Sequence, residues 1–323
     1  MKSKYISWIE AEIKKQKFGS APVSLYDPIR YIMSLGGKRL RPLLVLLAYS
    51  IYKDNTKKIV NAAVAVEAFH NFTLLHDDIM DKAPLRRGKK TVHEKWNINT
   101  AILAGDVMLV KVYEQLLANV ESKKLKEALV KFNHCAAEVC EGQQWDMEFE
   151  SKKNVTEEEY IQMIRQKTAV LLGFSLEFGA LLAQAPPKDQ VALRNFGIDI
   201  GIGFQLKDDW LDVYGDGQKF GKQVGGDILA NKKTFLLITA QSLARGKSKT
   251  ELLKWIGSTK FDNREKVRAI TGLYDRLRVS QHSEKMINKY FSRGLKRLEN
   301  LEVSEGKKKI LRDYTLKLID RIT

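Results

Sequence analysis

Apolar residues recur along most of this chain at intervals of three and four positions, the spacing of a helix that buries one face. Apolar and polar residues in strict alternation, the pattern of a half-buried strand, are scarce. The six prolines leave two stretches, 85–185 and 188–323, in which nothing forces a helix to end. The pattern predicts an all-α protein that forms a single domain over residues 1–323.

Several individual helices can be predicted from this spacing and from their end signals. We expect helices over residues 5–15, 62–75, 101–120 and 125–150. Thr156 followed by Glu159 forms a capping box, which predicts the start of a further helix. Between residues 251 and 322 the predicted helices are basic on one side and apolar on the other, which favours packing or oligomer contacts.

The formal charge of +16 favours polyanionic partners such as diphosphates, nucleic acid or anionic lipid, although a solvated basic surface explains most of these lysines. No nucleic-acid recognition motif is present, so a nucleic-acid partner is not expected. Two cysteines are too few for a disulfide framework. The chain opens without a signal-peptide pattern and holds no run of about 20 apolar residues, which predicts a cytoplasmic protein without a transmembrane segment.

Two aspartate clusters share one spacing and mark the main candidate chemistry. The first, Asp77, Asp78 and Asp81, ends the apolar run before residue 76, and the second repeats it at Asp208, Asp209 and Asp212. Aspartates four residues apart project from one face of a helix. Carboxylate oxygens are the ligands that magnesium prefers. One cluster alone is often a solvated surface, but two copies predict a facing pair of magnesium sites.

Basic residues stand at positions that suit a diphosphate. Lys38 and Arg41 flank a turn after two glycines, where arginine can bind a diphosphate as a fork and lysine as a point charge. Arg86 and Arg87 follow the first aspartate cluster, where they could neutralise phosphates that the metals also bind. Lys167 interrupts an apolar stretch and needs a partner. Each segment taken alone also fits an ordinary basic loop or helix surface.

In this order, from Gly36 to Lys232, the motifs resemble those of the trans-isoprenyl diphosphate synthases, the polyprenyl synthetase family, and in particular its short-chain geranylgeranyl and farnesyl members. The resemblance implies long, mostly antiparallel helices around a central apolar cavity, a homodimer, and condensation of isopentenyl diphosphate with an allylic diphosphate. It also implies three magnesium ions, held by the six motif aspartates with support from Asp146.

The resemblance implies a role for each matching residue. The isopentenyl diphosphate ligands would be Lys38, Arg41, His70 and Arg87. The allylic diphosphate would contact Arg86, Lys167, Thr168, Gln205, Lys222 and Lys232, of which the first four are the expected catalytic residues, and Asp227 would lie near the second metal set. The loop 215–226 is expected to be either a lid over the phosphates or a plain connector. Departing pyrophosphate is the expected base for the final proton.

Residues just before Asp77 are expected to limit the length of the product. Thr73 is small, and Phe72, five positions before Asp77, is the first bulky ring, about 7.5 Å away along a helix. Family members with this arrangement make geranylgeranyl diphosphate, which is the favoured product; farnesyl diphosphate or a longer polyprenyl diphosphate is the alternative. Phe72 could instead only pack on a neighbouring helix, in which case Phe69 or another residue sets the length.

Three other functions compete with this interpretation. A terpene cyclase shares the first aspartate motif but usually carries an Asn/Ser/Glu motif where this chain has the second. A metal phosphohydrolase is suggested loosely by His70 and by His76 beside Asp77, but five scattered histidines are few for transition-metal ligation. A non-catalytic subunit of a heteromeric synthase would be expected to lack aspartates from one motif, and none is missing here.

Overall fold

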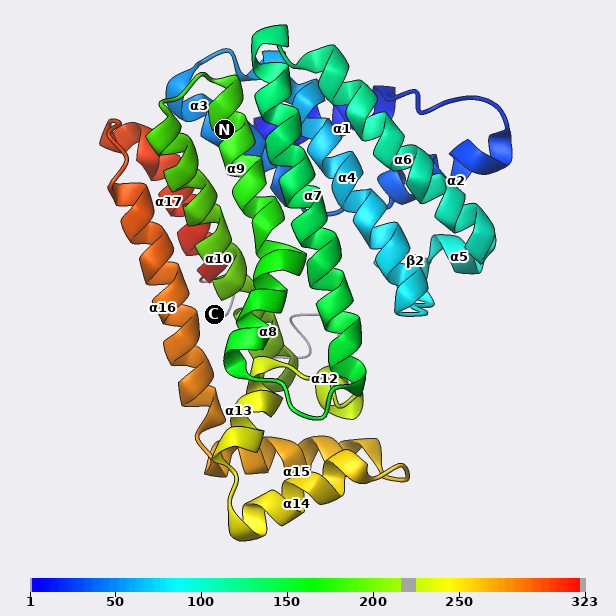
Figure 1. Ribbon diagram of the computed structural model, residues 1–323, viewed down its shortest axis with the longest axis vertical. Helices are drawn as coiled ribbons and strands as arrows, with labels where there is room; N and C mark the ends of the chain where they lie inside the picture. Colours follow the sequence, from blue (N-terminus) through cyan, green and yellow to red (C-terminus); the bar gives the residue numbers. More distant parts are fainter. Residues whose placement is uncertain (1, 216–224, 320–323) are drawn as a thin grey trace. The chain divides into compact units, whose positions relative to one another are not determined.

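The computed structural model describes residues 2–215 and 225–319, and helices dominate them (Figure 1). Within this part of the chain the strands are β1 (Leu85–Arg86) and β2 (Lys89–Lys90), which form one antiparallel pair. The predicted all-α class is confirmed. The small hairpin was not predicted, because two-residue strands carry no alternating pattern.

The chain folds into two compact units. The first comprises the described residues of Met1–His134, Phe174–Arg194 and Glu302–Lys307, and the second those of Cys135–Gly173, Asn195–Leu301 and Lys308–Thr323. Both units belong to the region that was predicted to be one domain, and that assignment stays a prediction.

The helices are distributed between the units as follows. The first unit contains α1 (Lys2–Lys15), α2 (Val23–Ser34), α3 (Leu40–Tyr52), the 3₁₀ turn η1 (Thr56–Ile59), α4 (Val60–Met80), α5 (Val92–Lys95) and α6 (Ile98–Asn119). The second contains α8 (Glu157–Ile164), the π-helical turn η2 (Arg165–Ala169), α12 (Gly226–Leu229), α13 (Phe235–Leu243), α14 (Gly246–Gly257), α15 (Asn263–Arg276) and α16 (Val279–Glu299). Helices α7 (Ser122–Ser151), α9 (Val170–Leu182), α10 (Pro187–Tyr214) and α17 (Glu305–Ile319) contribute residues to both.

Helix α4 forms the centre of the first unit, where it packs against α1, α2, α3 and α6 (Figure 1). Small buried residues such as Ala65 and Ala68 on α4, and Ala104 on α6, let the helices approach closely. Gly179 on α9 also lies against α3, since a Cβ there would be 2.2 Å from the Val45 carbonyl oxygen. This packing fixes the helix that ends at the first aspartate cluster.

The second unit is built in the same way around α10, α13 and α16. Gly203 on α10 lies against the Phe291 ring of α16, and Gly294 on α16 lies against Ile200 of α10. Each helix therefore has a glycine where a bulky side chain of the other helix packs. Leu236, Leu273 and other apolar residues of α13 and α15 form a buried cluster beside them. Helix α10, which carries the second aspartate cluster, is held by these contacts.

The four ranges predicted as helices are all helical, except that α6 ends one residue early, at Asn119. The expected 62–75 helix is α4, and the 125–150 helix is α7. The capping box at the start of α8 is confirmed, because the Glu159 amide donates to the Thr156 hydroxyl (3.2 Å) and the Thr156 amide donates to the Glu159 carboxylate (2.9 Å). Across residues 2–215 and 225–319 we find no helix with the length and apolar character needed to span a bilayer.

Candidate active site

The first aspartate cluster lies at the C-terminal end of α4, and its three members differ in exposure. Asp78 is buried, Asp77 is half-buried, and Asp81 is the exposed C-cap. Arg86 donates from Nε to both Asp78 oxygens (2.8 Å each), and its Nη2 lies 3.7 Å from Asp77 Oδ2. Burial raises the pKa of Asp78, and the Arg86 guanidinium opposes that rise. The middle aspartate is therefore turned inward onto a protein cation.

The hairpin explains how Arg86 reaches this position. Arg87 (φ 53°) and Gly88 (φ 74°) both have positive φ, as a two-residue type I′ turn requires, and Arg86 pairs with Lys89 across the strands. Lys89 and Lys90 are exposed. The turn carries Arg87 away from the carboxylates, and its Nη1 donates to the Gly36 carbonyl oxygen in the turn that holds Lys38.

Of the predicted isopentenyl diphosphate ligands, Arg41 and His70 contact each other in the first unit. Arg41 donates from Nη1 to Nε2 of the half-buried His70 (3.0 Å). Lys38, three residues before Arg41, is exposed. Burial and the nearby Arg41 guanidinium hold the pKa of His70 well below its ordinary value. His70 is therefore neutral near pH 7 and accepts this hydrogen bond at Nε2.

The second aspartate cluster, on α10, repeats the inward turn of its middle member. Asp209 is buried, Asp208 is exposed and Asp212 is half-buried. Asp209 accepts hydrogen bonds from the Tyr160 hydroxyl and from Gln205 Nε2 (3.1 Å). Burial raises the pKa of Asp209 to about 7, in spite of the Tyr160 hydrogen bond. The sequence motifs did not include Tyr160, and its position three residues into α8 gave no signal of this contact.

Lys167 and Thr168 lie in the π-helical turn η2, a wider turn than that of an α-helix and one that is common at functional sites. Glycines on two neighbouring helices make room for it. A Cβ at Gly142 on α7 would lie 2.1 Å from the Lys167 backbone nitrogen, and one at Gly201 on α10 would lie 2.7 Å from the Ala169 Cα. The π turn and these two glycines together set where Lys167 and Thr168 stand.

The partner that Lys167 requires is supplied by the protein itself. Lys167 Nζ donates to Asp146 Oδ2 at 2.6 Å, and both side chains are half-buried. The Thr168 hydroxyl donates to Gln205 Oε1 at 3.5 Å, the outer limit for such a contact. Four of the predicted residues of the second unit are thus brought together in pairs, and Gln205 connects the Thr168 pair to Asp209.

The segment after the second cluster forms hydrogen bonds with α10 and α7. The Asp227 amide, at the start of α12, donates to Asp212 Oδ2 (2.9 Å). Lys232 is exposed. The next residue, Lys233, donates from Nζ to the carbonyl oxygen of Phe149 near the end of α7. Lys222 lies outside the described residues.

The outward aspartates have the chemistry of a magnesium site. Asp77 and Asp81 at the end of α4, and Asp208 and Asp212 on α10, offer hard oxygen donors that are less buried than those of Asp78 and Asp209, although Asp212 also accepts the Asp227 amide. In the part of the chain that the structure covers, no three carboxylate, imidazole or thiolate groups converge on one point. Magnesium commonly completes its coordination with water and phosphate oxygens, so the donors present fit this ion.

Phe72, the predicted limit on product length, is buried in a row of aromatic rings. It meets His76 edge to face at a centroid distance of 4.8 Å and lies 5.7 Å from Phe69. Phe69 in turn contacts Phe132 of α7 edge to face at 5.0 Å. Thr73 is half-buried, and its hydroxyl donates to the His70 carbonyl oxygen (2.8 Å). Phe72 is therefore held by its own helix and backed by a second ring.

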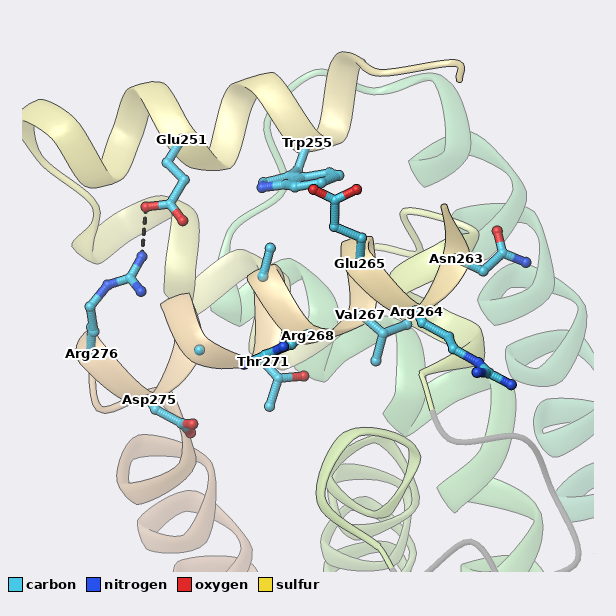
Figure 2. Close-up of a pocket in the computed structure, with 12 residues that line it drawn as sticks. Glu251, Trp255, Asn263, Arg264, Glu265, Val267, Arg268, Thr271, Asp275 and Arg276 are labelled. Atoms are coloured by element: carbon cyan, nitrogen blue, oxygen red, sulfur yellow. Dashed lines mark hydrogen bonds and ion pairs between the residues drawn. The ribbon is translucent and has the colours of Figure 1, made fainter. Parts of the chain in front are cut away.

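A separate open cavity of about 1040 Å³ lies along α14 and α15 (Figure 2). Its lining includes Trp255 and Thr271, and an ion pair between Glu251 and Arg276 (2.6 Å) closes part of one side. It contains none of the residues that the sequence predicted for the site. The cavity is therefore not part of the candidate active site.

The family model described as polyprenyl synthetase matches residues 22–274. The chain is similar to the geranylgeranyl pyrophosphate synthase of Geoglobus acetivorans, with 39% identity over 97% of this chain and 93% of the relative. Among solved structures, it is similar to one titled as a geranylgeranyl pyrophosphate synthase (41% identity, TM-score 0.94, 100% of this chain and 99% of the other). It is also similar to the geranylgeranyl pyrophosphate synthase of Corynebacterium glutamicum complexed with isoprenyl diphosphate and magnesium (27% identity, TM-score 0.82, 99% and 97% coverage). The predicted family is confirmed: the chain belongs to the polyprenyl synthetase family of prenyltransferases.

Proposed function

We propose that this enzyme condenses isopentenyl diphosphate head to tail with an allylic diphosphate, with geranylgeranyl diphosphate as the main product. Within the family, one observation carries the proposal: both aspartate clusters are complete, and each has an inward middle aspartate held by the protein and outward aspartates at the helix surface. A terpene cyclase would not need the second cluster or the Lys38–Arg41 turn. Two complete clusters also argue against a non-catalytic subunit.

Magnesium ions would be held by Asp77, Asp81, Asp208 and Asp212, and the expected number is three. When bound, they neutralise the negative charge of the allylic diphosphate and of the leaving pyrophosphate. The solved structure of the Corynebacterium glutamicum relative, which is complexed with magnesium, supports this choice of metal. Asp78 and Asp209 would then orient the clusters, because hydrogen bonds already fix their carboxylates.

Two sets of side chains would bind the two diphosphates. Lys38, Arg41 and the neutral His70 would bind isopentenyl diphosphate, for which Arg41 is already oriented by its hydrogen bond to His70. Arg86 and Lys167 now contact carboxylates and would turn part of their charge toward the allylic diphosphate. Positive groups aimed at the leaving pyrophosphate stabilise the charge that develops when the carbon–oxygen bond breaks.

The bond changes balance without a protein base. The allylic carbon–oxygen bond breaks, and its electron pair leaves with pyrophosphate. The double bond of isopentenyl diphosphate then forms the new carbon–carbon bond with the allylic carbon, and one proton passes to pyrophosphate. The Thr168 hydroxyl and the Gln205 amide would present their dipoles to the allylic cation, and their mutual hydrogen bond supports that arrangement.

Phe72 is the proposed limit on product length. Its ring is buried and is supported by His76 and Phe69, so it can resist a growing prenyl chain. The small Thr73 beside it leaves room for the first part of that chain. Farnesyl diphosphate or a longer product remains the alternative to geranylgeranyl diphosphate, and the apolar cavity that would hold the prenyl chain remains a prediction.

A homodimer is the proposed assembly, and the outer face of α6 supports it. Leu103, Val110 and Leu117 are 57%, 56% and 55% exposed and recur every seven residues, which aligns them in one apolar stripe. The opposite face of α6 is already packed against α4. Light scattering of the wild type and of Val110→Glu tests this: a dimer that becomes a monomer is expected, and a wild-type monomer would contradict it. A cytoplasmic location remains a prediction.

The proposed reaction is tested by removing one outward carboxylate from each cluster. Asp77→Asn and Asp208→Asn should each lower kcat by about 100-fold or more, because metal ligands and their supports typically carry effects of this size. Asp54→Asn, at a fully exposed aspartate of the first unit, is the control and should keep full activity. Near-normal turnover in either cluster variant would contradict a reaction that needs both clusters.

A further inference from the structure

Arg39 is the middle residue of the basic turn, and its environment differs from that of Lys38 and Arg41. It has left-handed backbone angles (φ 47°, ψ 41°) at the start of α3 and is 2% exposed. Lys38 before it is exposed, and Arg41 after it is half-buried. A buried guanidinium in a run of basic residues is unusual, because arginine is rarely fully buried unless it is paired.

Three helices supply acceptors to this one guanidinium. Arg39 Nε donates to Glu10 Oε1 of α1, and Nη1 donates to Glu67 Oε1 of α4, both at 2.8 Å. Nη2 donates to the Met33 carbonyl oxygen of α2, also at 2.8 Å. These charge-assisted bonds have defined directions, so they fix the orientation of the turn as well as its distance from each helix.

The contacts to α4 form two parallel connections. Arg39 reaches Glu67, and Arg41 reaches His70, which lies one helical turn further along the same face. A third point of attachment is Arg87, whose Nη1 donates to the Gly36 carbonyl oxygen at the other end of the turn. These contacts fix the position of the turn from Gly36 to Arg41 along α4, the helix that carries the first aspartate cluster.

Stability alone does not explain this arrangement. A buried ion pair often contributes little, because the cost of removing both charges from water offsets their attraction. A non-glycine residue with left-handed angles adds a further cost. Moreover, Glu67 Oε2 is buried without a hydrogen-bond partner. A well-packed apolar pair would fill the same space without these costs.

We propose that Arg39, through Glu67, is a positioning residue for isopentenyl diphosphate: it holds Lys38 and Arg41 in the register with α4 that diphosphate binding requires. This inference rests on the proposed function, which assigns Lys38 and Arg41 to that substrate. Arg39 itself does not touch the substrate. The residue acts through the position of its two neighbours.

The test replaces the pair by apolar residues of similar volume, Arg39→Met with Glu67→Leu. The thermal midpoint should stay within a few degrees of the wild type, since such replacements are often neutral or stabilising. The KM for isopentenyl diphosphate should rise roughly tenfold or more, a loss of about 1.4 kcal/mol per tenfold. The KM for the allylic substrate and kcat should change much less. Arg39→Lys, which keeps a cation opposite Glu67, should recover part of the loss.

Arg30→Met is the matched control, because Arg30 also makes an ion pair and a bond to a carbonyl oxygen, with Asp27 (2.6 Å) and Gly19 (2.9 Å), but at the surface of α2. It should leave both KM values unchanged. Equal KM values for isopentenyl diphosphate in the double variant and the wild type would overturn the proposal. If the double variant does not fold, Glu67→Met, which removes the acceptor of Arg39 Nη1, provides the same comparison, and an unchanged KM there overturns it equally.

Calorimetric titration of isopentenyl diphosphate, without an allylic substrate, separates this inference from the proposed function. If the wild type binds and condenses the substrate, and the double variant binds it about tenfold more weakly, the positioning role is supported. If both bind equally, only the positioning role fails. If the wild type neither binds nor condenses the substrate, the proposed function fails first.

Discussion

Replacing Gly142 by alanine should disable the enzyme, although Gly142 has no chemistry of its own. The new Cβ would lie 2.1 Å from the Lys167 backbone nitrogen and 2.6 Å from its Cα, whereas ordinary van der Waals contact begins at 3.4 Å. Both neighbouring atoms belong to the backbone, so no side chain can rotate out of the way. Either α7 or the π turn must move.

The size of the effect follows from this overlap. A displacement of roughly 1 Å at a residue that binds the reacting group can lower turnover about 100-fold. Overpacking of this kind usually costs about 1–3 kcal/mol of stability, which leaves the protein folded but lowers its thermal midpoint by several degrees. We therefore expect kcat to fall about 100-fold, with Lys167 no longer placed to pair with Asp146.

Steady-state kinetics with an allylic substrate and isopentenyl diphosphate, together with thermal unfolding, measure both effects. Gly272→Ala is the control: it lies inside α15, and the nearest atom to its new Cβ would be the end of the Arg276 side chain at 3.8 Å. This variant should keep full activity. A Gly142→Ala enzyme with normal kcat would show that the position of the π turn does not matter for turnover.

Three other changes give separate tests. Phe72→Ala should lengthen the main product by at least one isoprene unit with little loss of rate, and chromatography of the dephosphorylated products would show an unchanged distribution if Phe72 is not the limit. Lys38→Ala should raise the KM for isopentenyl diphosphate more than that for the allylic substrate, and Lys167→Ala should do the reverse; equal rises in both would reject the assignment. Tyr160→Phe removes the hydroxyl that orients Asp209, so the magnesium concentration for half-maximal rate should rise about 10- to 100-fold, and an unchanged magnesium titration would exclude that role.

The sequence was informative wherever a local pattern decides the structure. The apolar spacing predicted α4 and α7, and the Thr156 and Glu159 side chains predicted the start of α8 with both of its hydrogen bonds. The spacing of the aspartates also predicted that Asp77 and Asp81 stand on one helix, and they lie in the last turn and at the C-cap of α4. These features depend on residues within one or two helical turns of each other.

The remaining features depend on residues that are distant in the chain. Lys167 pairs with Asp146, 21 positions earlier, and Arg39 pairs with Glu67, 28 positions later. The π turn has no local signal, because Gly142 on another helix makes room for it. No spacing rule along one segment can indicate such pairs, since they arise only when helices pack.

Incubation of the purified enzyme with magnesium, labelled isopentenyl diphosphate and farnesyl diphosphate tests the proposed reaction most directly. Chromatography after removal of the phosphates identifies the prenyl chains, and a parallel assay measures released pyrophosphate. We expect geranylgeranyl diphosphate as the main product, one pyrophosphate released for each new carbon–carbon bond, and no reaction when magnesium is chelated. Release of phosphate or pyrophosphate without a lengthened prenyl chain would contradict the proposed reaction.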